Sequence, residues 1–225
     1  MNKPDKNSVR QTPTIPLNVF RRASRLLWEE LFLLGVASYI LMLLGVTIVL
    51  LPPLTVGLMY MANQVARGNA IGFAMLFSGG RRFLSRSYIW GAINACAIVL
   101  LLADLTYYQQ LQGDLGIAAV TLALLLALAW GIVQLLTLPL LIELGPRSLK
   151  TAFRQALLLT ISQPAFVIGL VIASALLALL CWFFPILIGF AFAYLALVVN
   201  IAIVRLRDPE IDRQMAQRQP RSMQK

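Results

Sequence analysis

The chain has 225 residues, of which 60% are hydrophobic and only 12% are charged, and its net charge is +10. A soluble domain of this length has no room to bury so much apolar side chain, because its surface is largely polar. The composition therefore predicts an integral membrane protein. Apolar runs near 20 residues predict membrane helices. A membrane β-barrel would instead show segments of ~10 residues in which apolar and polar residues alternate, and these runs do not alternate.

The apolar runs predict an all-α bundle of about six membrane spans in a single domain, residues 26–206. A basic tail (1–25) precedes this domain and a polar tail (207–225) follows it, and we expect no cleavable signal peptide. The predicted spans, in chain order, are Leu31–Leu51, Leu54–Ala66, Tyr88–Tyr108, Leu115–Ile142, Ala165–Phe184 and Ile186–Val204.

The second predicted span is short and follows a pair of prolines, which either kink one long helix or turn the chain back. The 19 Lys and Arg residues all lie on one side of the membrane if this span crosses, whereas they are divided between the sides if it does not. The positive-inside rule favours the first arrangement, with both termini cytoplasmic. The basic groups are the two tails, then Arg67, Arg81, Arg82 and Arg86, and then Arg147, Lys150 and Arg154.

Proline fixes φ and lacks an N–H, so a proline pair suits a turn or the first turn of a helix. We expect Thr55 to cap the helix that follows and Gly68 to end it. Thirteen residues span only ~20 Å, so the bilayer is thinned, Arg67 reaches down to the interface, or the turn lies below the outer surface. The candidate turn motif is Pro52, Pro53, Thr55 and Gly57.

Two cytoplasmic connections, 68–91 and 146–162, predict helices that lie in the headgroup layer, because each combines apolar residues with cationic flanks. The first is interrupted by Gly79–Gly80. Their basic face either anchors the bundle or docks a cytoplasmic partner. Attraction to anionic lipid accounts for the net positive charge, so nucleic acid is not an expected partner. The basic face comprises Arg67, Arg81, Arg82, Arg86, Arg147, Lys150 and Arg154.

Four amide side chains lie at similar depths in the inner halves of the predicted spans, which predicts a polar cluster. Such amides either join helices through hydrogen bonds, or bind a ligand or line a conduction path. Glu143 is expected to pair with Arg147, four residues further on. With no His in the chain and no nucleophile–base pair, neither a metal or cofactor site nor an enzyme is expected. The four amides are Asn63, Asn94, Gln134 and Asn200.

The stretch LPPLTVGLMYMANQVARGN (51–69) combines a proline pair, Thr and Gly with a helix that ends in a basic residue and Gly. In this motif the chain resembles the YesL-like family of bacterial membrane proteins, which is grouped under a domain of unknown function. The resemblance covers most of residues 18–206 in order and spacing. The other similar stretches are RLLWEELFLLG (25–35), FLSRSYIWGAIN (83–94), LLTLPLLIE (135–143), LKTAFRQALLL (149–159) and NIAIVR (200–205).

The resemblance implies a multi-pass protein of the bacterial plasma membrane, often associated with carbohydrate import, and it supplies no catalytic residue. We therefore expect an accessory or regulatory component, with the lipid bilayer and ABC importer subunits as partners. The alternative is a stand-alone transporter or channel for small solutes, in which the N-terminus of the short helix binds an anionic group through its dipole. The sequence sets no oligomeric state.

Overall fold

The computed structural model describes residues 33–45, 49–110, 113–145 and 148–208, whose regular structure is helical throughout. The predicted helical class is confirmed, and α4, α5, α7 and α8 are long and apolar enough to cross a membrane. In chain order the helices are Leu33–Gly45, α2 (Leu51–Ala66), α3 (Ala74–Arg82), α4 (Leu84–Tyr108), α5 (Asp114–Leu144), α6 (Leu149–Ser162), α7 (Pro164–Phe183), the 3-10 turn η2 (Pro185–Leu187) and α8 (Ile188–Arg207).

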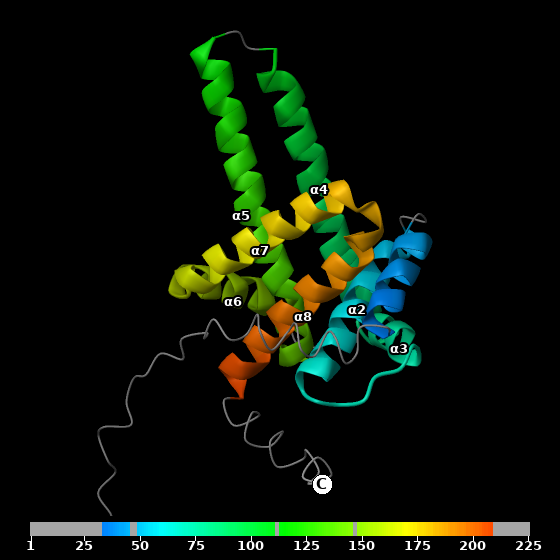
Figure 1. The fold of residues 1–225 in the computed structure, drawn as a ribbon. Helices are drawn as coiled ribbons and strands as arrows, with labels where there is room; N and C mark the ends of the chain where they lie inside the picture. The colour runs from blue at the N-terminus through cyan, green and yellow to red at the C-terminus, as the bar shows by residue number, and fades with distance from the viewer. Residues whose placement is uncertain (1–32, 46–48, 111–112, 146–147, 209–225) are drawn as a thin grey trace, which may run out of the picture.

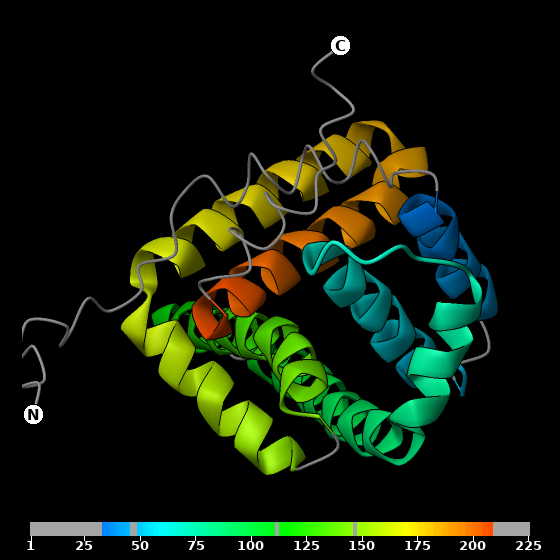
Figure 2. The same ribbon diagram turned by 90° about the horizontal axis from the view of Figure 1, so that it is seen from below.

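The long helices form two antiparallel pairs. α4 and α5 make a hairpin whose tip extends well beyond the other helices (Figure 1). α7 and α8 make the second pair, which lies beside the base of this hairpin (Figure 2). In the same view α6 lies on one side of the molecule, whereas α2, α3 and the helix Leu33–Gly45 lie on the other.

The buried core lies at the base of the α4–α5 hairpin. It is made by α2 and α8, each of which buries 11 residues, and by the second half of α5. In contrast, α4 buries only Ser87 among its 25 residues, although the helix is strongly apolar. An apolar helix with so little buried surface is expected to face lipid or another membrane protein.

The chain is broken and reversed near the proline pair, as predicted. The helix Leu33–Gly45 and α2 lie side by side and run in opposite directions (Figures 1 and 2). Ala37 and Leu41 of the first helix share a buried cluster with Leu54 and Leu58 of α2. The two prolines lie in the first turn of α2, where a missing N–H breaks no helical hydrogen bond.

The two ends of α2 differ from each other in how their backbone groups are satisfied. Thr55 is not the N-cap, so that prediction is wrong: the helix begins four residues earlier, and Thr55 Oγ1 donates to the carbonyl of Leu51 at 2.8 Å. The predicted end at Gly68 is confirmed, with φ of 72°. Its N–H donates to Val65 O at 2.9 Å, and the next N–H donates to Gln64 O at 3.0 Å, which completes a Schellman motif.

Glycines bring α3 against α2 at backbone distance. A Cβ on Gly57 would overlap the carbonyl oxygen of Leu76, and a Cβ on Gly80 would lie 2.5 Å from the carbonyl oxygen of Pro53. The predicted interruption at Gly79–Gly80 is wrong, because both glycines lie inside α3. The helix instead ends at Arg82, and Phe83, with φ of −111° and ψ of 18°, separates α3 from α4.

Candidate functional site

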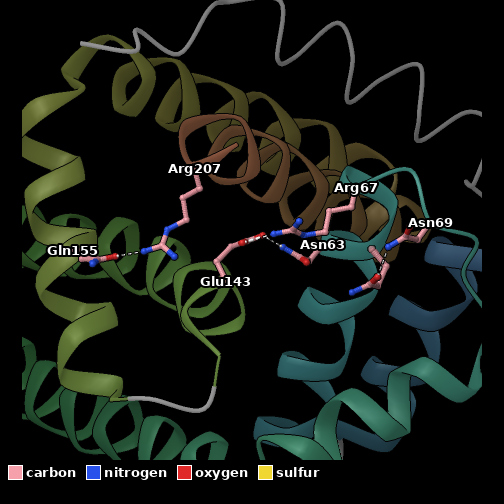
Figure 3. Close-up of polar contacts among 7 residues, drawn as sticks. Asn63, Arg67, Asn69, Glu143, Gln155 and Arg207 are labelled. Atoms are coloured by element: carbon pink, nitrogen blue, oxygen red, sulfur yellow. Dashed lines mark hydrogen bonds and ion pairs between the residues drawn. The ribbon is translucent and has the colours of Figure 1, made fainter. Parts of the chain in front are cut away.

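A charged contact joins the C-terminal ends of α2 and α5. Arg67 Nη2 donates to Glu143 Oε2 at 2.5 Å, and Asn63 Nδ2 donates to Glu143 Oε1 at 2.7 Å (Figure 3). Asn63 and Arg67 are four residues apart, so α2 presents both donors on one face. The Glu143 side chain is only 4% exposed, whereas that of Arg67 is 35% exposed. The carboxylate is thus buried with both oxygens satisfied.

These partners differ from the one expected from the sequence. Arg147, the predicted partner of Glu143, lies outside the described residues, and the partners that the structure shows come from α2. Asn63 and Glu143 are 80 positions apart in the chain, so helical spacing alone does not reveal that they are partners. The available signal was that Asn63 and Arg67 share a helical face near the same predicted membrane depth as Glu143.

A second polar contact links α4 to α5 through reciprocal tryptophan–amide pairs. Trp90 Nε1 donates to Gln134 Oε1 at 2.8 Å, and Trp130 Nε1 donates to Asn94 Oδ1 at 3.2 Å. Within each helix the tryptophan and the amide are four residues apart, and the helices run antiparallel, so the two bonds cross one interface. Asn94 Nδ2 also donates to the carbonyl of Trp90 at 2.8 Å. This geometry supports a role in holding the helices together.

Replacing Gln134 with leucine is expected to lower the free energy of unfolding in detergent by about 1–2 kcal/mol, because the Trp90 N–H loses its acceptor in apolar surroundings. The melting temperature of purified protein measures the change. Gln64→Leu is the matched control, since among the described residues its side-chain amide bonds to the exposed side chain of Asn69 alone. Unchanged heat stability combined with a defect in cells would instead favour a ligand role for Gln134.

The fourth amide, Asn200, lies between α8 and α2 and is fully buried. Its Nδ2 donates to Ala196 O at 2.7 Å and lies 3.7 Å from Met59 Sδ. Its Oδ1 has no hydrogen-bond partner among the described residues. The predicted polar cluster is therefore divided among three separate contacts, since within the described ranges no hydrogen bond joins one of these amides to another: Asn63 with Glu143, Asn94 and Gln134 with tryptophans, and Asn200 with Met59.

In the alternative interpretation, a transporter, the N-terminus of α2 is the point that binds an anion. The four N–H groups that a helix leaves unpaired at its start are the donors such a site needs. Leu50 is the N-cap, and two of the next three positions are Pro52 and Pro53, which have no N–H. The prolines that position this helix therefore also remove half of its free donors, which weakens the transporter interpretation.

The predicted basic face is divided by the structure. Arg67 points inward to Glu143, and Arg147 lies outside the described residues. The other basic side chains come from α3 and the first turn of α4 and from α6, and α3 and α6 lie on opposite sides of the core (Figure 2). Large apolar side chains are exposed on the same segments, as expected for helices in a headgroup layer. These basic residues are Arg81, Arg82 and Arg86 on one side and Lys150 and Arg154 on the other.

Comparisons with protein-family models, with curated proteins and with solved structures return no match. The resemblance to the YesL-like family accordingly stays a prediction, and the function is argued from the geometry.

Proposed function

We propose that this is a non-catalytic accessory protein of the bacterial plasma membrane that associates sideways with a membrane transporter. The α4–α5 hairpin carries the proposal. It extends beyond the core and exposes large apolar side chains along most of its length (Figure 1). Because the hairpin extends past the other helices of its own bundle, its apolar faces can pack against the helices of a partner protein.

The polar side chains support the same proposal. Glu143 is occupied by two donors from α2, and Gln134 and Asn94 each accept a hydrogen bond from a tryptophan of the facing helix. Buried polar groups in membrane proteins serve either function or helix association. Here their observed partners are other helices of the same bundle, which favours the structural use.

A carbohydrate ABC importer is the first partner to test, because the YesL-like resemblance implies that association. Tagged protein is purified from native membranes, and the co-purifying proteins are identified by mass spectrometry. We expect transporter subunits to be enriched with the wild-type chain. Failure to recover any transporter subunit, together with unchanged sugar uptake after deletion, would rule out this role.

Two matched double variants locate the contact. Ile98→Trp with Leu102→Trp alters an exposed face of α4, and Ile172→Trp with Leu176→Trp makes the same change on an exposed face of α7. The amount of partner that co-purifies is expected to fall at least tenfold for the α4 variant and to stay unchanged for the α7 variant. Equal losses from both would show that the hairpin is not the contact surface.

We further infer that four helices cross the membrane and that the helix Leu33–Gly45 and α2 form a re-entrant hairpin. A Cβ on Gly91 would lie 2.5 Å from Pro52 Cγ, and Gly91 is the eighth of the 25 residues of α4. From this contact α4 continues for a further ~25 Å, most of a hydrocarbon core of ~30 Å. The proline turn therefore lies at the depth of the first third of α4.

Cysteine labelling tests this topology, after Cys96 and Cys181 have been replaced with serine. Gln110→Cys, beside the α4–α5 turn, is expected to react with an impermeant maleimide added to intact cells, and Arg81→Cys only after the membrane is opened. Val49→Cys, 67% exposed next to the proline turn, is expected to react in neither case because lipid covers it. External labelling of Val49→Cys would show two full spans, and external labelling of Arg81→Cys would reverse the orientation.

A further inference from the structure

A cavity of about 300 Å³ lies where α5, α6 and α8 meet. Most of its lining is apolar and comes from all three helices, and Ser162 lies at the end of α6. Its polar edge is formed by Gln155 of α6 and Arg207, the last residue of α8. The apolar lining residues are Leu140, Leu158, Leu159, Ile203 and Leu206.

The polar edge holds a positive charge in a defined position. Arg207 Nη2 donates to Gln155 Oε1 at 3.1 Å, which ties the end of α8 to the middle of α6 (Figure 3). A guanidinium has five N–H donors, and this bond uses one of them. Arg207 is exposed, so the other donors face outward, and the Gln155 amide group adds N–H donors beside them.

The order of these groups matches the structure of a lipid. A phosphate group fits an outward-facing guanidinium, which binds two of its oxygens at once, and an acyl chain fits leucine and isoleucine side chains. Free phosphate would use the cation but not the apolar lining. The helix α6, which supplies half of the lining, also carries Lys150 and Arg154, and such basic residues attract anionic headgroups.

We propose that this groove binds an anionic glycerophospholipid, with one acyl chain along the apolar lining and the phosphate on Arg207 and Gln155. The lipid then bridges α6 and α8 at the point where the hydrogen bond between Arg207 and Gln155 joins the two helices. The inference concerns lipid recognition and does not depend on the transporter partner proposed above.

Native mass spectrometry of the full chain in detergent tests the site. Phosphatidylglycerol and phosphatidylcholine with identical acyl chains are titrated separately, and inorganic phosphate is added as a competitor. We expect tighter binding of phosphatidylglycerol, weakened about fivefold by Arg207→Gln and less by Arg207→Lys, as expected for one basic side chain near a membrane surface. The control is Arg154→Gln, which removes the same charge from an exposed residue that does not line the groove.

The apolar part is tested with Leu158→Trp, which fills the groove from an exposed position, against Ile161→Trp, an exposed position of α6 outside the lining. Lipid binding that is weaker for Leu158→Trp but unchanged for Ile161→Trp supports the site. If Arg207→Gln is not monodisperse, the comparison of these two tryptophan variants is the deciding test. Equal effects of Arg207→Gln and Arg154→Gln would overturn it as general charge attraction. Displacement of the lipid by inorganic phosphate at similar concentration would also overturn it, as a simple anion site.

Discussion

Replacing Gly57 with alanine is expected to destabilise the fold more than any other single-methyl change in α2. The added Cβ would overlap the carbonyl oxygen of Leu76 and lie 3.0 Å from its carbonyl carbon. Both are backbone atoms of α3, so the clash cannot be relieved by turning a side chain. Since Gly80 makes the reciprocal close approach to Pro53, the two helices would have to separate along their contact. We expect a loss of at least about 3 kcal/mol, the upper end of the usual cost of overpacking.

Size-exclusion profiles in detergent and melting temperatures measure this effect. Gly131→Ala is the matched control, because Gly131 also lies inside a helix but a Cβ there meets no atom within 4 Å. The control is expected to be neutral or stabilising by up to ~1 kcal/mol, because alanine favours helix more than glycine does. A Gly57→Ala protein as stable as the wild type would show that α2 and α3 do not pack at this distance.

Replacing Glu143 with alanine is the second large expected effect, with a loss of about 2 kcal/mol in the free energy of unfolding. The change leaves the Arg67 guanidinium and the Asn63 amide without their shared acceptor. Removing one partner of a fully buried ion pair typically costs ~3–5 kcal/mol. The expected loss is smaller here because Arg67 is 35% exposed, so water screens the charge that remains.

A double-mutant cycle separates the pair from its surroundings. Glu143→Leu, Arg67→Met and the double variant are compared by thermal unfolding in detergent, with Arg81→Met as the control for loss of an exposed cation. The double variant is expected to be more stable than Glu143→Leu alone, because it no longer leaves a charge without its partner. Strictly additive effects would mean that Arg67 and Glu143 do not interact in solution.

The class of protein, the positions of the long helices and the reversal near the proline pair could all be predicted from the chain itself. These features depend on local properties: the length of an apolar run, the missing N–H of proline and the positive φ that glycine accepts at Gly68. Predicted and observed ends of α4, α5, α7 and α8 accordingly differ by only a few residues. Thr55 was misplaced because the helix accommodates both prolines in its first turn and so begins before them.

The hydrogen-bond partners of the polar residues could be identified only from the tertiary structure. Helical spacing pairs Glu143 with Arg147, but the carboxylate is satisfied from α2, and the amides expected in one cluster have different partners. Helix propensity alone also predicts that Gly79 and Gly80 interrupt a helix. In the folded protein their missing side chains allow α3 to approach α2, and this packing outweighs their low helix propensity.

The position of the proline turn shows most clearly the difference between what local sequence predicts and what tertiary packing decides. The distribution of Lys and Arg indicates that the chain returns to the side from which it started, and this holds for two full spans and for a re-entrant hairpin alike. Depth depends on which residue of a long helix the turn contacts. That residue is Gly91, 39 positions from Pro52 along the chain, and the contact is possible because glycine leaves space for the proline ring. Composition and charge thus predict the class of protein and the reversal of the chain, because these depend on local properties. Close packing between distant residues decides which part of α4 lies beside the proline turn.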